Sequence, residues 1–260
     1  MSLTGKSPSE TYKDLTYVDN NNSGVDSTTR SVKTGNGSET SLSLSDRAVK
    51  IKSSTDNTAA LDVQNSSGTS KLLVDTTNSQ VKALGTHINT QYAQFGIGSG
   101  DSVWAGASAG NHYAVPFNSI VTQALVGGGT GTDPATSFTI ATTADDMVGV
   151  MWYIMDNITI DRVVWWSGGD AATGETTRTH LMSYTIDSGN SATSGDLSSG
   201  AVVAYSSDVT NAGYEQAYYN QMTISTADVD AGKVLMFFFR ADSTVNSDYT
   251  INATVKYHLR

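Results

Sequence analysis

The residues of this chain best suited to bind a partner are two pairs of neighbouring aromatic side chains. Trp165 and Trp166 stand beside the turn SGGD, and Tyr218 and Tyr219 lie within GYEQAYYNQ. Successive residues of a strand point to opposite faces of a sheet, so one ring of each pair is expected to face outward. An outward ring could stack on a sugar or anchor a protein partner. The more ordinary role of such pairs is packing in a core or between subunits.

Histidine spacing argues against a bound metal. The four histidines, His87, His112, His180 and His258, are widely separated in the sequence. Metal-binding motifs commonly hold two of their ligands only about two to five residues apart. The chain also has no cysteine, which excludes disulfides, zinc–thiolate sites and iron–sulfur clusters. The sequence therefore predicts no metal and no other cofactor.

The glycine-rich stretch GGGTGTD at 127–133 is not a phosphate-binding loop. It lacks the Lys and Ser/Thr that follow the glycines of such a loop. Acidic residues of the second half could supply a pair for sugar cleavage, but such carboxyls must lie about 5–10 Å apart across a cleft. Sequence spacing does not establish that geometry. We expect a protein that is not an enzyme, with a polysaccharide depolymerase as an alternative.

Charge and hydropathy narrow the range of partners. The formal net charge is −10 and no cluster of Lys and Arg occurs, which argues against nucleic acid, because affinity for phosphates comes from clustered cations. The longest apolar stretches, 147–155 and 234–239, are much shorter than the roughly 20 residues that cross a bilayer. We expect no membrane partner and interpret both stretches as buried strands.

Composition predicts an all-β fold. The chain has 33 Ser, 34 Thr and 24 Gly, whereas charged residues make up only 15%. Thr is β-branched, Ser competes for backbone hydrogen bonds and Gly weakens helix interiors, so this composition favours strands and turns over helices.

A compositional boundary indicates two modules. Residues 1–85 hold nine basic and nine acidic residues and only two aromatic ones, Tyr12 and Tyr17. Residues 86–260 hold six basic and sixteen acidic residues together with all the Trp and Phe. The glycine-rich segment 86–113 has no sustained period, and we interpret it as a connector. The predicted organisation is thus an N-terminal module over 1–85, a connector over 86–113 and a C-terminal domain over 114–260.

The first module has apolar residues at every second position of short segments. They are Leu42, Leu44, Val49, Ile51, Leu61, Val63, Leu72 and Val74. Alternation predicts strands with one apolar face. Strands this thin bury little surface within one chain, so we expect identical chains to cover that face in a homo-oligomer. A flexible tail is the alternative.

The C-terminal domain reads as a series of strands separated by glycine-rich turns. The expected strands span 115–126, 137–142, 147–155, 157–166, 176–186, 201–206, 220–225, 233–240 and 248–259. Short strands at this spacing predict a β-sandwich or jelly roll. In the strand over 157–166, simple alternation groups Ile158 and Ile160 with Trp166 on one face, and Val163 with Trp165 on the other.

Two N-terminal stretches resemble a known family. Residues 7–51, SPSETYKDLTYVDNNNSGVDSTTRSVKTGNGSETSLSLSDRAVKI, resemble the N-terminal modules of tailed-phage fibres and other virion appendage proteins. There, a TYKDL-like stretch precedes a VDNxNSGVD segment, a glycine-containing turn and an LxLSxxxVxI strand pair. Residues 60–85, ALDVQNSSGTSKLLVDTTNSQVKALG, are similar to the LDVxNSxGTxxxxVDTTNxxV repeat of phage fibre shafts.

This resemblance implies a structural protein of the virion. Such appendages are usually homotrimers that attach to capsid or tail proteins through an N-terminal module and end in a β-sandwich knob. A receptor- or glycan-binding tip that contacts the host surface is the alternative function that the resemblance implies.

Overall fold

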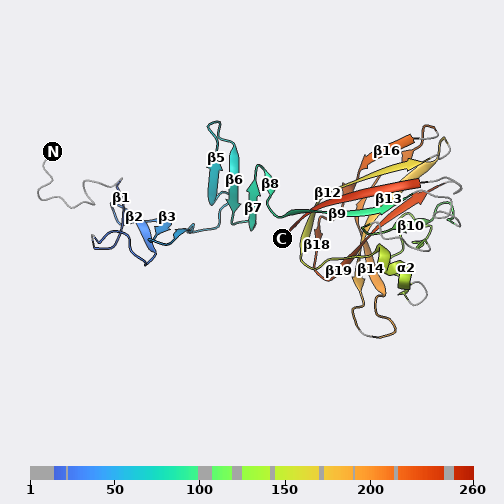
Figure 1. Ribbon diagram of the computed structural model, residues 1–260, viewed down its shortest axis with the longest axis horizontal. Coiled ribbons are helices and arrows are strands. Elements are labelled where there is room, and N and C mark those ends of the chain that lie inside the picture. Colours follow the sequence, from blue (N-terminus) through green and yellow to red (C-terminus); the bar gives the residue numbers. More distant parts are fainter. Residues whose placement is uncertain are drawn as a thin grey trace, which may run out of the picture. The chain divides into compact units, whose positions relative to one another are not determined.

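A computed structural model describes residues 15–21, 23–98, 107–118, 125–140, 144–169, 173–189, 191–213, 216–242 and 249–260. These residues are almost entirely strands and turns, which confirms the predicted all-β class (Figure 1). The chain divides into two compact units, residues 1–88 and 89–260. Among the described residues, no helix combines the length and the apolar character that a bilayer span requires.

The first unit contains two four-stranded antiparallel sheets, in each of which every strand pairs with the next along the chain. One sheet consists of β1 (Thr16–Val18), β2 (Arg30–Thr34), β3 (Glu39–Leu44) and β4 (Val49–Ile51). The other consists of β5 (Leu61–Gln64), β6 (Ser70–Asp75), β7 (Gln80–Ala83) and β8 (Thr86–His87). The β5–β6 hairpin turns through Gly68, whose φ of +77° is one that glycine adopts without strain.

The eight apolar residues selected by alternation form one face on each of these sheets. The eight residues are cross-strand partners of one another: Leu42 pairs with Ile51, Leu44 with Val49, Leu61 with Val74, and Val63 with Leu72. Directly opposed residues and alternate residues share a face of a sheet, so each sheet carries four of the eight side chains on one side.

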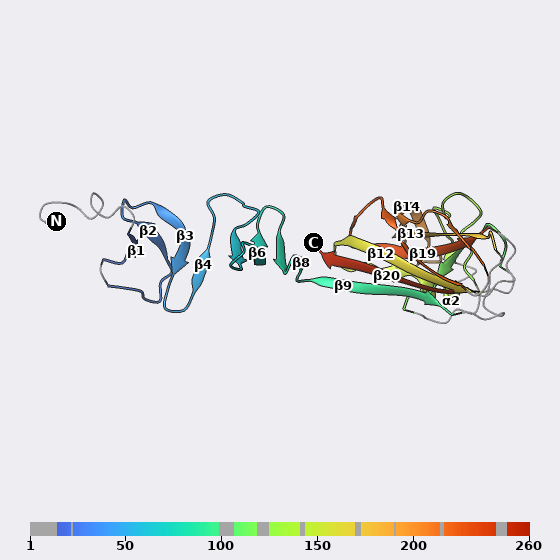
Figure 2. The same ribbon diagram turned by 90° about the horizontal axis from the view of Figure 1, so that it is seen from above.

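The second unit contains two larger antiparallel sheets. The smaller sheet has the order β16–β12–β20–β9, with β18 beside β12. Its strands are β9 (Thr90–Ile97), β12 (Ile158–Gly169), β16 (Gln216–Gln221), β18 (Asp228–Val229) and β20 (Tyr249–Leu259). Figure 2 shows β9, β20 and β12 side by side.

The larger sheet has the order β10–β19–β13–β14–β17, with β11 beside β19 and β15 beside β13. Its strands are β10 (His112–Val115), β11 (Trp152–Tyr153), β13 (Thr176–Ile186), β14 (Leu197–Tyr205), β15 (Val209–Thr210), β17 (Thr223–Ile224) and β19 (Lys233–Ala241).

The main core lies between these two sheets. Trp165 of β12, Phe95 of β9 and Phe237 of β19 are fully buried in it, and the rings of Phe95 and Phe237 stack with centroids 5.8 Å apart. A second apolar cluster covers the other face of the larger sheet, where Met147 of helix α2 (Ala144–Val150) packs in one cluster with Phe238. The larger sheet is therefore buried on both faces.

The predicted connector is wrong over much of its length. Residues 90–97 form β9 and residues 112–115 form β10, so both stretches belong to the sandwich. In β9 the inward residues are Ala93 and Phe95, which are buried, and Ile97, which is partly buried against the same core. Residues 99–106 of the predicted connector lie outside the described residues.

The predicted strand over 147–155 is also wrong in its first half, which forms α2 and leaves only Trp152 and Tyr153 in a strand. A short apolar run does not distinguish a buried strand from one helical turn, and Met147 and Val150 fall three apart on the buried side of the helix. Of the segment predicted over 137–142, residues 141–142 lie outside the described residues, and the described part contributes an isolated bridge at Phe138. Residues 119–124 of the strand predicted over 115–126 lie outside the described residues. The other predicted segments overlap β12, β13, β14, β16, β17, β19 and β20.

Candidate functional site

The smaller sheet of the sandwich exposes large aromatic side chains on its outer face. Trp166 is 52% exposed, Tyr219 is 47% exposed and Tyr92 is 65% exposed. Exposed aromatic groups on one surface often mark a place where a ligand or a partner binds. We call this surface the open face and define it by its outward side chains, Tyr92, Arg162, Trp166, Tyr219, Asn252 and Lys256.

A β-bulge in β12 decides which tryptophan belongs to the open face. Against β20, Ile160 pairs with Tyr257 but Arg162 pairs with Lys256, so Asp161 is an extra residue. An extra residue reverses the alternation of every residue that follows.

The inner face of β12 consequently differs from the one predicted by simple alternation. Ile158 and Ile160, which precede the bulge, are buried together with Val163 and Trp165, which follow it. The predicted grouping of the two isoleucines with Trp166 is therefore wrong, and Trp166 points away from the core.

Trp166, Tyr219 and Arg162 form a connected cluster on the open face. Trp166 and Tyr219 are cross-strand partners, and their ring centroids lie 5.0 Å apart with the planes inclined by 58°. The Nη2 of Arg162 donates a hydrogen bond of 2.7 Å to the hydroxyl of Tyr219. The hydrogen bond orients the guanidinium beside two exposed rings.

The other two aromatic candidates have structural positions. Trp165 is fully buried in the main core, as its place on the opposite face of β12 requires. Tyr218 is half-buried, and its hydroxyl accepts a hydrogen bond of 2.7 Å from the backbone N–H of Ala212 and donates one to Gln216. Of the four predicted contact residues, Trp166 and Tyr219 are available to a partner.

Two cationic side chains lie next to each other on the open face. Arg162 of β12 is the direct cross-strand partner of Lys256 of β20, and Lys256 is in turn the partner of Tyr92 of β9. Polar uncharged side chains surround them: Asn252 and Thr254 precede Lys256 on β20, and Gln94 follows Tyr92 on β9. The open face can therefore offer aromatic planes, hydrogen-bonding groups and positive charge together.

A separate cavity of about 560 Å³ is lined in part by strands β13 and β14. Its lining includes Thr132, Asp133, Arg178, His180, Tyr205, Ser206 and Asp208. Arg178 donates a hydrogen bond of 2.7 Å from Nε to Oδ1 of Asp208. The lining of the cavity therefore includes an ion pair.

Two histidines that are distant in the sequence meet beside this cavity. The rings of His112 and His180 lie edge to face with centroids 5.1 Å apart, and the Nε2 of His180 is 3.3 Å from an oxygen of Asp133. Burial, together with the neighbouring His112, lowers the pKa of His180 to about 4 in spite of Asp133. His180 is therefore neutral at physiological pH.

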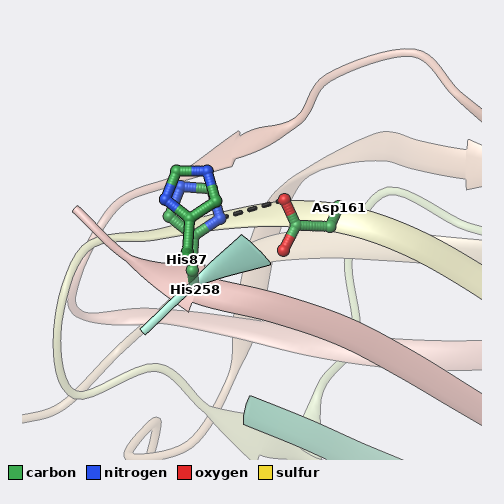
Figure 3. Close-up of side chains that lie close together, drawn as sticks. All are labelled: His87, Asp161 and His258. Atoms are coloured by element: carbon green, nitrogen blue, oxygen red, sulfur yellow. Dashed lines mark hydrogen bonds and ion pairs between the residues drawn. The ribbon is translucent and has the colours of Figure 1, made fainter. Parts of the chain in front are cut away.

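A third histidine secures the bulge of β12. The Nδ1 of His258 on β20 lies 3.0 Å from Oδ1 of Asp161, the extra residue of the bulge (Figure 3). His258 is buried, so this bond is largely shielded from water. His87, also labelled in Figure 3, belongs to the first unit.

Sequence reasoning identified Trp166 and Tyr219 but missed Tyr92, Arg162, Asn252 and Lys256. These four become neighbours of the aromatic pair only through the strand order β16–β12–β20–β9, which joins the beginning of the unit to its end. A scan against models of known protein families gives no match to this chain, and a search of curated proteins gives no match either.

Proposed function

We propose that this chain is a non-enzymatic structural protein of a tailed-phage virion, assembled as a homotrimer through its first unit and displaying the second unit as a knob. The observation that carries the proposal is that the described residues of the first unit form no core of their own. Among residues 15–21 and 23–88, only Val32 and Asp75 are buried. Domains that fold alone ordinarily bury most of their large apolar side chains.

The exposed side chains of the first unit are organised and not scattered. Val49 is 68% exposed, Ile51 45%, Val63 47% and Leu72 37%, and all four lie on the apolar faces of their sheets. Isolated sheets of short strands are marginally stable in water unless another layer covers them. Copies of the same chain provide such a layer at a fixed stoichiometry.

The resemblance of residues 7–51 and 60–85 to phage fibre modules favours three copies and a place on the virion. It also favours attachment to other virion proteins of the capsid or the tail. The acidic, cysteine-free second unit suits a knob exposed outside the cell, where it neither needs nor offers a thiol.

The mass of the full chain in solution tests this proposal. Light scattering coupled to size exclusion, repeated over a series of micromolar concentrations, should give a mass three times the 27.4 kDa of one chain. A monomer at every concentration contradicts the assembly proposal. A dimer would preserve self-assembly but contradict the trimer.

A second candidate function is recognition of a host receptor or glycan by the knob. The open face favours it, because Trp166 and Tyr219 are exposed together and Arg162 is fixed beside them. The double variant W166A/Y219A should lose binding to host cells while the oligomeric mass stays unchanged. Loss of the oligomer in this variant would instead assign the two rings to a subunit interface.

A further inference from the structure

The open face places two like charges directly opposite each other. Arg162 and Lys256 are cross-strand partners, and neither forms an ion pair with a carboxylate among the described residues. Like charges at directly opposed positions destabilise a sheet. Their mutual repulsion would be relieved by a negatively charged group bound between or above them.

This cationic position is unusual for the unit that contains it. Residues 86–260 carry sixteen acidic and six basic side chains. The three arginines at other described positions, Arg178, Arg240 and Arg260, are all paired with aspartates. The open face thus keeps its two cations unneutralised in a strongly acidic unit, and this charge is complementary to an anionic partner.

We infer that the open face binds an anionic polysaccharide, with Arg162 and Lys256 contacting its acidic groups and with Trp166 and Tyr219 stacking on its sugar rings. This inference rests on the adhesive role proposed for the knob and names the class of ligand. It does not depend on the number of subunits.

The side chains between the aromatic rings favour a polysaccharide over a protein surface. Asn252, Gln94 and Gln221 are exposed and can donate to and accept from sugar hydroxyls. The centre of a protein interface is instead usually depleted of lysine, whereas Lys256 lies among these side chains. Val164 lies in register with Gln221, Thr254 and Gln94 on the open face, and this aliphatic side chain is half-buried.

The arrangement of the rings also suits an extended chain. Tyr219 on β16 and Tyr92 on β9 are separated by two intervening strands, and three strand spacings correspond to about 14 Å. Tyr219 and Trp166 are level with Asn252, whereas the two cations are level with Tyr92, so a ligand that crosses the strands obliquely would meet the Trp166–Tyr219 pair first and then the cations of β12 and β20. Tyr92 would be its last aromatic contact.

Binding of the full chain to defined polysaccharides tests the inference. The probes are polygalacturonate, its carboxyl-reduced form, dextran sulfate and unmodified dextran, measured by calorimetry at one ionic strength. We expect polygalacturonate or dextran sulfate to bind at least about tenfold more tightly than its uncharged counterpart, and comparing the two shows whether carboxylate or sulfate is preferred. Failure of both anionic polymers to bind overturns the inference.

Variants assign the binding to individual side chains. R162Q and K256Q should each weaken binding of the anionic polysaccharide about tenfold. Binding of the uncharged counterparts should change little. K233Q is the matched charge control, because Lys233 lies on the larger sheet and bonds Thr185. Y153A is the matched aromatic control for W166A, since Tyr153 is 49% exposed on that other sheet. An equal loss in K233Q would reduce the effect of R162Q and K256Q to net charge, and an equal loss in Y153A would make the effect of W166A unspecific; either result would overturn the site.

The same samples separate this inference from the assembly proposal. A wild-type monomer that binds the anionic polymer contradicts the trimer and supports the site. A trimer that binds neither polymer supports assembly and contradicts the site. If R162Q or K256Q changes the oligomeric mass, the open face is an interface between copies and the inference is wrong.

Discussion

The two units place the same alternating pattern in different surroundings. In the second unit, inward residues such as Trp165, Phe237 and Val255 are fully buried between two sheets. In the first unit, alternate residues such as Val49 and Val63 occupy one face of a sheet and remain exposed. Alternation thus determines which face is apolar in both units. Whether that face becomes a core depends on a second layer and on side-chain size, and residues 1–85 have only two aromatic side chains.

This contrast separates two sources of stability. The second unit is expected to gain most of its stability within one chain, because its inner faces cover each other. Under the assembly proposed above, other copies supply the layer that covers the first unit, so its stability should depend on protein concentration.

The largest expected effect is the loss of assembly when a charge is placed on an apolar face of the first unit. I51D puts a carboxylate on that face of β4, and burying it between chains without a partner is strongly unfavourable. The variant should be monomeric by light scattering at concentrations where the wild-type chain is assembled. K50D is the control, since Lys50 points to the other face of the same strand. Equal dissociation of both variants would show that the apolar face is not the interface.

The next effect compares two neighbouring tryptophans of the second unit. W165A removes a fully buried ring from the main core and should lower the free energy of unfolding by about 3–5 kcal/mol. W166A removes a half-exposed ring and should lower it by less than about 1 kcal/mol. Urea unfolding followed by circular dichroism measures both. A larger loss for W166A would contradict the assignment of the two faces of β12.

A smaller effect concerns the dependence of the second unit on pH. In the folded chain the pKa of His180 is about 4, whereas an unfolded histidine has a pKa of about 6.5. As pH falls, the unfolded chain binds this proton first, so the free energy of unfolding decreases by about 2–3 kcal/mol between roughly pH 6.5 and 4.

Thermal unfolding over this range checks the sign and the residue. H180Q cannot bind the proton, so its melting temperature should fall less steeply as the solution is acidified. A residual decrease is expected from His112, whose pKa burial also lowers. If the melting temperature of H180Q falls with pH as steeply as that of the wild-type chain, His180 is not the group that causes the decrease.

The smallest effect is expected from Y219F on the open face. The variant loses the hydrogen bond from Arg162 but keeps the ring beside Trp166. Because the bond is exposed, the free energy of unfolding should change by no more than about 1 kcal/mol. Anionic binding should weaken only a few-fold, as the guanidinium loses its orientation and not its charge. A loss as large as that of R162Q would indicate that the hydroxyl itself contacts the ligand.

Much of this architecture follows from local patterns in the sequence. The placement of apolar residues at every second position identified both apolar faces of the first unit. Leu42 and Ile51, for example, are cross-strand partners on one of them. The same placement also identified long strands such as β13 and β19, because their β-branched and aromatic residues recur between clear turns.

The remaining features depend on contacts that local patterns do not contain. The bulge at Asp161 is secured by His258, which lies almost a hundred positions further along the chain. Helix α2 is too short to show a helical period. The cation pair of the open face forms only when Lys256 of the last strand comes to lie beside Arg162.

The bulge also lets β12 carry one residue more than its partner while its apolar side chains stay on one face. Without Asp161, Arg162 would follow Ile160 directly, and simple alternation would then place Ile158, Ile160, Val163 and Trp165 together on the inner side. Deleting the single codon for Asp161 should therefore straighten the strand and leave Trp165 in the core and Trp166 in solvent.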